Sequence, residues 1–137
     1  MIIVDTGAML ALLDVKSQHY VSIRELYEEN ASAWILPSAI LPEVDYLLST
    51  QLGAKVQDAF FADVADGAFS VEWGRDEDIA AAYRIHARYR SLRIGFVDAM
   101  VVATAERLHA EAIATLDLRH FSAVSIKGDP RLLPRDM

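Results

Sequence analysis

The chain contains no cysteine, which excludes disulfide bonds, zinc–thiolate sites and cysteine nucleophiles. Long apolar runs are also missing, because even the longest stretch without a charged residue, 30–42, is well short of the roughly 20 apolar residues that span a bilayer, and the strongly apolar run AMVVATA is shorter still. The amino-terminal segment MIIVDTGAML lacks a basic region and carries Asp5 within its apolar part, so we expect no signal peptide. These absences predict a cytoplasmic protein with no membrane partner.

Motifs of several common enzyme classes are absent. Gly7 belongs to no G-x-G-x-x-G and no GxxxxGK[ST] exists, so no nucleotide-binding loop is predicted. No G-x-S-x-G occurs, and a serine hydrolase is therefore unsupported. Histidines at metal-ligand spacing such as H-E-x-x-H are also missing. We expect all four histidines to be surface residues or residues with satisfied hydrogen bonds: His19, His86, His109 and His120.

What is present indicates a folded α/β domain. With 137 residues and 53% hydrophobic content, the chain is long enough for one domain over 1–137 with a substantial core. Short apolar runs alternate with segments of helical periodicity, which predicts a mainly parallel sheet covered by helices on both faces. We expect strands at 2–4, 33–37, 68–73 and 112–116, with a fifth at 123–126. Helices are expected at 7–14, 20–30, 39–52, 54–66, 76–90 and 96–110, with Thr6 and Ser38 as N-caps.

Four carboxylates stand at or just after apolar stretches, namely Asp5, Glu43, Asp98 and Asp117. An acid beside a buried strand or helix start needs a compensating partner, because its desolvation costs free energy. Asp5 and Asp117 follow strands, so they fall at the edge where an open α/β sheet binds ligands. Asp98 lies in a first helical turn and Glu43 within reach of the same rim. A hard cation such as Mg²⁺ or Mn²⁺, which prefers oxygen ligands, would serve all four.

Each acid also has a simpler explanation. Asp5 could cap the first helix, and Asp98 could lie in a first turn without any metal. Glu43 could face solvent, as helical glutamates usually do, and Asp117 could be a turn residue. All four explanations holding together is the less economical reading, so the pattern favours an acidic metal pocket.

The net charge of −7 argues against a nucleic-acid partner when taken alone. Bound cations would, however, neutralise acids gathered in a metal pocket. Arg84, Arg88 and Arg93 lie close together in the sequence and are candidates for phosphate contacts. The rival explanation for Arg84 and Arg88 is that bases at the end of a helix complement its dipole.

Four segments together resemble the PIN domain family and, within it, the VapC-like toxin ribonucleases of type II toxin–antitoxin pairs: VDTGAMLALL, PEVDYLL, GFVDAMVVATAERL and IATLDLRHF. By position, Asp5, Glu43, Asp98 and Asp117 match the acidic quartet of the family. Thr6 and Thr115 match its small polar neighbours, which support the pocket. The resemblance implies a three-layer α/β/α PIN-like fold with a short, mainly parallel sheet of four to five strands. It also implies a Mg²⁺- or Mn²⁺-dependent endoribonuclease, usually a homodimer, inhibited by a cognate antitoxin protein.

Our hypothesis for the site is that Asp5 and Asp98 are central metal ligands, while Glu43 and Asp117 complete the shell directly or through water. Attack of water on RNA would leave a 5′-phosphate and a 3′-hydroxyl, with RNA contacts from Arg84, Arg88 and Arg93. Phe60 and Phe61 cannot both be buried by one helix face, so we expect one to be exposed, as a candidate dimer or antitoxin contact.

Three alternatives remain open at this point. The first is a PIN-fold nuclease of RNA processing without a toxin role. The second is a phosphotransfer domain, which would usually need a second acid after the first strand and a lysine beside the pocket. The third is a binding module that holds a basic peptide on its acidic rim.

Overall fold

Five short strands form one sheet in the computed structural model, which describes residues 1–137. In chain order they are β1 (Ile2–Val4), β2 (Trp34–Pro37), β3 (Ser70–Glu72), β4 (Ala112–Ala114) and β5 (Arg131–Leu133). Their spatial order is β3-β2-β1-β4-β5, and every adjacent pair is parallel. The order reverses between β1 and β4. The carboxyl ends of these two strands therefore flank the crevice in which open α/β sheets bind ligands.

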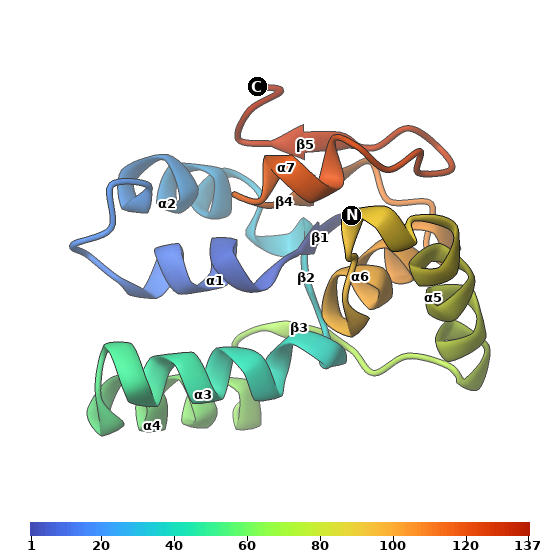
Figure 1. The fold of residues 1–137 in the computed structure, drawn as a ribbon. Helices are drawn as coiled ribbons and strands as arrows, with labels where there is room; N and C mark the ends of the chain where they lie inside the picture. The colour runs from blue at the N-terminus through green and yellow to red at the C-terminus, as the bar shows by residue number, and fades with distance from the viewer.

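Seven α-helices connect the strands, since parallel strands need long crossover connections. They are α1 (Thr6–Leu13), α2 (Tyr20–Glu29), α3 (Leu41–Gln51), α4 (Ala54–Ala65), α5 (Asp76–Arg88), α6 (Phe96–Arg107) and α7 (Leu118–Phe121). The helices pack on both faces of the sheet, which gives the three-layer α/β/α arrangement (Figure 1). In this arrangement α3 packs against α4 and α5 packs against α6. None of the helices has the length and apolar content needed to cross a bilayer.

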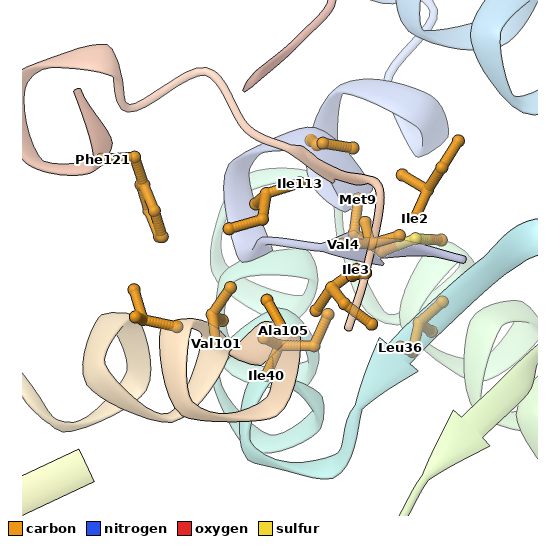
Figure 2. Close-up of a cluster of buried hydrophobic side chains, with 14 of the residues drawn as sticks. Ile2, Ile3, Val4, Met9, Leu36, Ile40, Val101, Ala105, Ile113 and Phe121 are labelled. Atoms are coloured by element: carbon orange, nitrogen blue, oxygen red, sulfur yellow. The ribbon is translucent and has the colours of Figure 1, made fainter. Parts of the chain in front are cut away.

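The core lies around the central strand β1, which is apolar on both faces. Ile2, Ile3 and Val4 are almost completely buried, as expected of a strand covered by helices above and below. Successive side chains of a strand point to opposite faces. In Figure 2, Ile3 lies toward α6, whose Val101 is labelled, and Met9 of α1 lies on the other side. This packing fixes the first turn of α6 relative to the end of β1.

The structure confirms the four main predicted strands but not the fifth. Residues 123–126 form no strand, and the fifth strand is Arg131–Leu133, beyond the Gly-Asp-Pro turn. The backbone N–H of Ser125 donates instead to the Tyr89 hydroxyl, at 2.9 Å. Leu132 and Leu133 are both buried and supply the apolar surface that lies beside β4.

Two of the predicted helix starts were wrong. Asp5, not Thr6, is the N-cap of α1, and its carboxylate accepts from the backbone N–H of Thr6. Ser38 caps no α-helix, because residues Ser38–Ile40 form a short 3₁₀ helix and the Ser38 hydroxyl donates to the carbonyl oxygen of Trp73. Pro42 lies in the first turn of α3, where its missing N–H has no intrahelical partner to lose.

Candidate active site

Asp5 joins the end of β1 to the start of α1 and is held there by three hydrogen bonds. Its backbone N–H donates to the carbonyl oxygen of Ala114 at 2.9 Å, which continues the pairing of β1 with β4. Its Oδ1 accepts from the backbone N–H of Thr6 at 2.8 Å, and its Oδ2 accepts from the hydroxyl of Thr115 at 2.9 Å. Only 5% of Asp5 is exposed. The carboxylate is therefore fixed at the switch point of the sheet.

Thr115 links the two strand ends on either side of that switch point. Its buried hydroxyl donates to Asp5 and accepts from the backbone N–H of Asp117 at 3.0 Å. A single hydroxyl thus sets the position of Asp5, which follows β1, relative to the segment that follows β4. The predicted supporting residue Thr115 lies where this role requires it.

Asp98 and Asp117 come together across the mouth of the crevice with His120 between them. Asp98 lies in the first turn of α6, and Asp117 is the N-cap of α7. Nδ1 of His120 lies 2.9 Å from Oδ2 of Asp117 and 3.3 Å from Oδ2 of Asp98. One ligand atom from each of the three residues falls within 4.8 Å of the others. This spacing is close enough for all three to bind a single ion.

The acids raise one another's affinity for protons. Burial is the main cause that raises the pKa of Asp5 from 3.8 to about 7, and the charges of Asp98 and Asp117 add to it. Hydrogen bonds from Thr115 and the Thr6 backbone oppose the rise. Burial likewise raises the pKa of Asp98, followed by the charge of Asp117. The site is therefore short of positive charge when only protein groups are present.

The other two predicted pocket residues, Glu43 and Thr6, lie at the edge of this cluster. Glu43 is exposed in the first turn of α3 and its carboxylate makes no hydrogen bond, but its charge contributes to the raised pKa of Asp98. Thr6 is buried beside Asp5, and its hydroxyl has no hydrogen-bond partner. A buried hydroxyl without a partner costs free energy. Thr6 therefore places beside the acids a polar atom that would gain from a ligand.

The three arginines predicted to contact RNA are all exposed and form no ion pair or hydrogen bond with the site acids. Arg84 and Arg88 lie on α5 and line a groove together with Lys127 and Glu106. Arg93 lies before α6 with a left-handed backbone conformation, at φ 55°. The groove carries charges of both signs, so it is not a uniform basic track.

The donor set fits a divalent cation. Asp98 and Asp117 offer carboxylate oxygens at the rim, and Asp5 is linked to their side of the site through Thr115. Burial first, and then the neighbouring negative charges, raise the pKa of Asp5 and of Asp98. Hard cations such as Mg²⁺ and Mn²⁺ take such oxygen ligands and supply the missing charge. The unpartnered hydroxyl of Thr6 offers a further polar atom at the same place.

His120 was missed by the sequence analysis. The interpretation as a satisfied histidine suits His86, whose Nδ1 lies 2.7 Å from the carbonyl oxygen of Ile94. It also holds for His120, whose Nδ1 is hydrogen-bonded to Asp117, but here the partners are carboxylates of the candidate site. The available signal was the three-residue spacing from Asp117, which is one helical turn.

Buried and rim carboxylates meeting at the switch point of a parallel sheet place this chain in the class of α/β domains with an acidic site at the carboxyl ends of the strands. Comparison with known families is more specific. The model of the PIN domain family matches residues 2–127, and this chain belongs to that family.

Known relatives agree with this assignment over nearly their whole length. Ribonuclease VapC26 of Mycobacterium tuberculosis is 34% identical over 129 residues, which cover 94% of this chain and 96% of the relative. Among solved structures, M. tuberculosis VapC20, described as a sarcin-ricin loop cleaving toxin, aligns with a TM-score of 0.82 and 21% identity over 93% of this chain and 98% of that chain. The DNA-bound VapBC of Salmonella typhimurium aligns with a TM-score of 0.72 and 23% identity, over 96% and 97% of the two chains.

Proposed function

We propose that this PIN domain is a metal-dependent endoribonuclease and the toxin of a toxin–antitoxin pair. The observation that carries the proposal is the meeting of Asp5, Asp98 and Asp117 at the switch point, where burial and mutual repulsion raise the pKa of Asp5 to about 7. The similarity to a ribonuclease over 94% of the chain supports RNA as the substrate.

The proposed role of each site residue follows from its position. Asp98 and Asp117 would hold the ion at the open rim, and Asp5 would complete its negative surroundings from the buried side. Glu43 is exposed enough to join directly or through water. Thr115 orients Asp5 and the segment of Asp117 through its two hydrogen bonds.

The chemistry that Mg²⁺ or Mn²⁺ would supply here is activation of water as a nucleophile and neutralisation of charge on the scissile phosphate. The protein's own part would be to hold the Asp5 carboxylate in one orientation toward the ion, which the two buried hydrogen bonds from Thr6 and Thr115 do. We propose hydrolysis that leaves a 5′-phosphate and a 3′-hydroxyl.

The direct test is cleavage of labelled RNA by the purified protein with Mg²⁺, with Mn²⁺ and with chelator. We expect cleavage with either ion, none with chelator, and loss of cleavage in Asp98→Asn. The matched control is Asp58→Asn, which removes an exposed carboxylate of α4. Equal cleavage in chelator, or full activity of Asp98→Asn, would overturn the metal-dependent reaction.

The toxin role has its own test, because a nuclease of RNA processing would pass the first one. Induced expression of the wild-type protein should arrest growth, and Asp5→Asn should relieve the arrest at the same protein level. Growth that continues despite active, soluble ribonuclease would favour the RNA-processing alternative.

For partners we propose a cognate antitoxin and a second copy of the chain in a homodimer. An apolar groove between α3 and α4 offers a protein contact, with Phe60 buried in its floor and two side chains exposed at its rim: Phe61, 68% exposed, and Trp73, 71% exposed. The exposure of Phe61 next to buried Phe60 confirms that only one of the pair packs inward. RNA contacts by Arg84, Arg88 and Arg93 are part of the same proposal.

A further inference from the structure

We propose that His120 is itself a ligand of the bound cation and that its nitrogen makes the site prefer Mn²⁺ to Mg²⁺. The inference deepens the proposed function and rests on it, since it concerns the ion at the same rim. It adds a nitrogen donor to a set of residues otherwise made only of oxygen donors.

The spacing of the donor atoms already matches that of neighbouring ligands on one ion. Nδ1 of His120 is 2.9 Å from Oδ2 of Asp117 and 3.3 Å from Oδ2 of Asp98. An octahedral ion with ligands at about 2.1 Å places adjacent ligand atoms about 3.0 Å apart. The histidine therefore needs little movement to serve as a third ligand.

The backbone holds the His120 ring in this place. The backbone N–H of His120 donates to Oδ1 of Asp117 at 3.1 Å. Asp117, itself a candidate ligand, therefore also fixes the first turn of α7, which carries His120. Only 26% of the His120 side chain is exposed. A ring turned inward between two carboxylates of a cation-binding rim is unlike a freely mobile surface histidine.

The chemistry of the donor decides which ion benefits. Carboxylates and water suit Mg²⁺ and Mn²⁺ alike, whereas imidazole suits first-row transition metals, a series in which Mn²⁺ binds most weakly and to which Mg²⁺ does not belong. Mg²⁺ also dehydrates reluctantly and keeps several waters. A nitrogen donor at position 120 therefore favours Mn²⁺, while Asp98 and Asp117 still admit Mg²⁺.

A purely positioning role for His120 makes a different prediction. In that case its Nδ1 only donates a hydrogen bond to Asp117, and removing it disturbs the carboxylates for every ion equally. A third role, in which the ring occupies the place of the ion, would make its removal strengthen the binding of both ions. The ratio of the Mn²⁺ affinity to the Mg²⁺ affinity distinguishes these two roles from that of a ligand, because only removal of a ligand lowers the ratio.

The experiment titrates Mn²⁺ alone and Mg²⁺ alone into the full chain by calorimetry, for wild type, His120→Asn and the control His109→Asn. His109 is exposed and has a positive φ of 51°, a conformation that asparagine tolerates. We expect His120→Asn to lower the Mn²⁺-to-Mg²⁺ affinity ratio by at least about tenfold, with His109→Asn unchanged. An equal loss for both ions, or tighter binding of both, would overturn the proposal.

A spectroscopic measurement on the wild-type protein keeps the test independent of any variant that folds poorly. Pulsed electron paramagnetic resonance of the Mn²⁺ complex should show modulation from a coordinated nitrogen, and His120→Asn should remove it. Bound Mn²⁺ without nitrogen modulation would refute the role of His120 yet leave the metal-dependent nuclease intact. Absence of Mn²⁺ and Mg²⁺ binding altogether would instead refute the proposed function.

Discussion

Replacing Asp5 by asparagine should stabilise the metal-free protein at alkaline pH. Burial, followed by the charge of Asp98, raises the pKa of Asp5 from 3.8 to about 7 in the folded state. Between these two values the folded protein keeps a proton that the unfolded chain releases. The stability due to this group is therefore fully present below the unfolded pKa and is lost as the pH rises through the folded pKa.

The size of the effect follows from the two pKa values. The difference between the two pKa values lowers the free energy of unfolding of the wild type by roughly 4 kcal/mol at about pH 8 and by only about 0.5 kcal/mol at about pH 4. An asparagine amide can still accept from the Thr6 N–H and donate to the Thr115 hydroxyl, but the hydroxyl proton then loses its acceptor, at a cost of about 1 kcal/mol. We therefore expect Asp5→Asn to raise the free energy of unfolding by about 3 kcal/mol at about pH 8, with no gain at about pH 4.

Urea unfolding in chelator, followed through the fluorescence of buried Trp34, measures this free energy. The control Asp58→Asn should change it by less than about 0.5 kcal/mol, because Asp58 is exposed. Saturating Mn²⁺ should reverse the order of stability, since an ion that binds the folded wild type more tightly stabilises it more. If Asp5→Asn is less stable than wild type in chelator at both pH values, the repulsion inferred among the site acids is wrong.

Three further predictions concern other parts of the molecule. Arg107→Gln should cost about 3 kcal/mol at neutral pH, because Asp78 is only 3% exposed and loses two hydrogen bonds from the guanidinium. Burial alone would raise the pKa of Asp78, but Arg107 holds it below its usual value. The stability difference in urea unfolding should therefore shrink as the pH falls through that lowered pKa, and a constant difference would contradict this. Arg84→Ala and Arg88→Ala should each flatten the salt dependence of RNA binding by about 0.7 in log–log slope if each contacts a phosphate; an unchanged slope would remove them from the RNA surface. Phe61→Ser should leave stability within about 0.5 kcal/mol but weaken antitoxin binding in a titration, whereas unchanged affinity would place the antitoxin elsewhere.

The strands and the acids at their ends were predictable because their signals are local. Ile2–Val4 is a run of apolar residues closed by Asp5, and such a run can only be a covered strand in so short a segment. The fifth strand was not predictable in this way. Residues 123–126 have more β-branched side chains than Arg131–Leu133, yet the N–H groups of Ala123 and Ser125 donate to the His120 carbonyl oxygen and the Tyr89 hydroxyl. The open edge of β4 then pairs with the next apolar segment available.

The role of His120 could not be predicted from spacing alone. Its neighbour Asp117 is three residues away, but Asp98 reaches the ring only because α6 crosses β1 and brings its first turn to the same edge of the sheet. That placement depends on tertiary packing around residues such as Val101, which no local pattern specifies. Motifs with a fixed sequence spacing detect candidate ligands on one helix, but they miss a candidate set whose members come from two separate segments, as here.

The two explanations that the sequence left open for Asp5 and Asp117, a helix cap and a site residue, do not exclude each other. Asp5 caps α1 and Asp117 caps α7, while each has its second oxygen directed to another group, Thr115 or His120. In a parallel sheet a strand ends where the following helix begins, so the residue that starts the helix lies at the ligand-binding edge. A carboxylate there satisfies a backbone N–H group with one oxygen, and the second oxygen, which has two lone pairs, could bind a cation beside its existing partner. Capping therefore lowers the cost of placing acids together and is one physical reason why this edge can hold several of them.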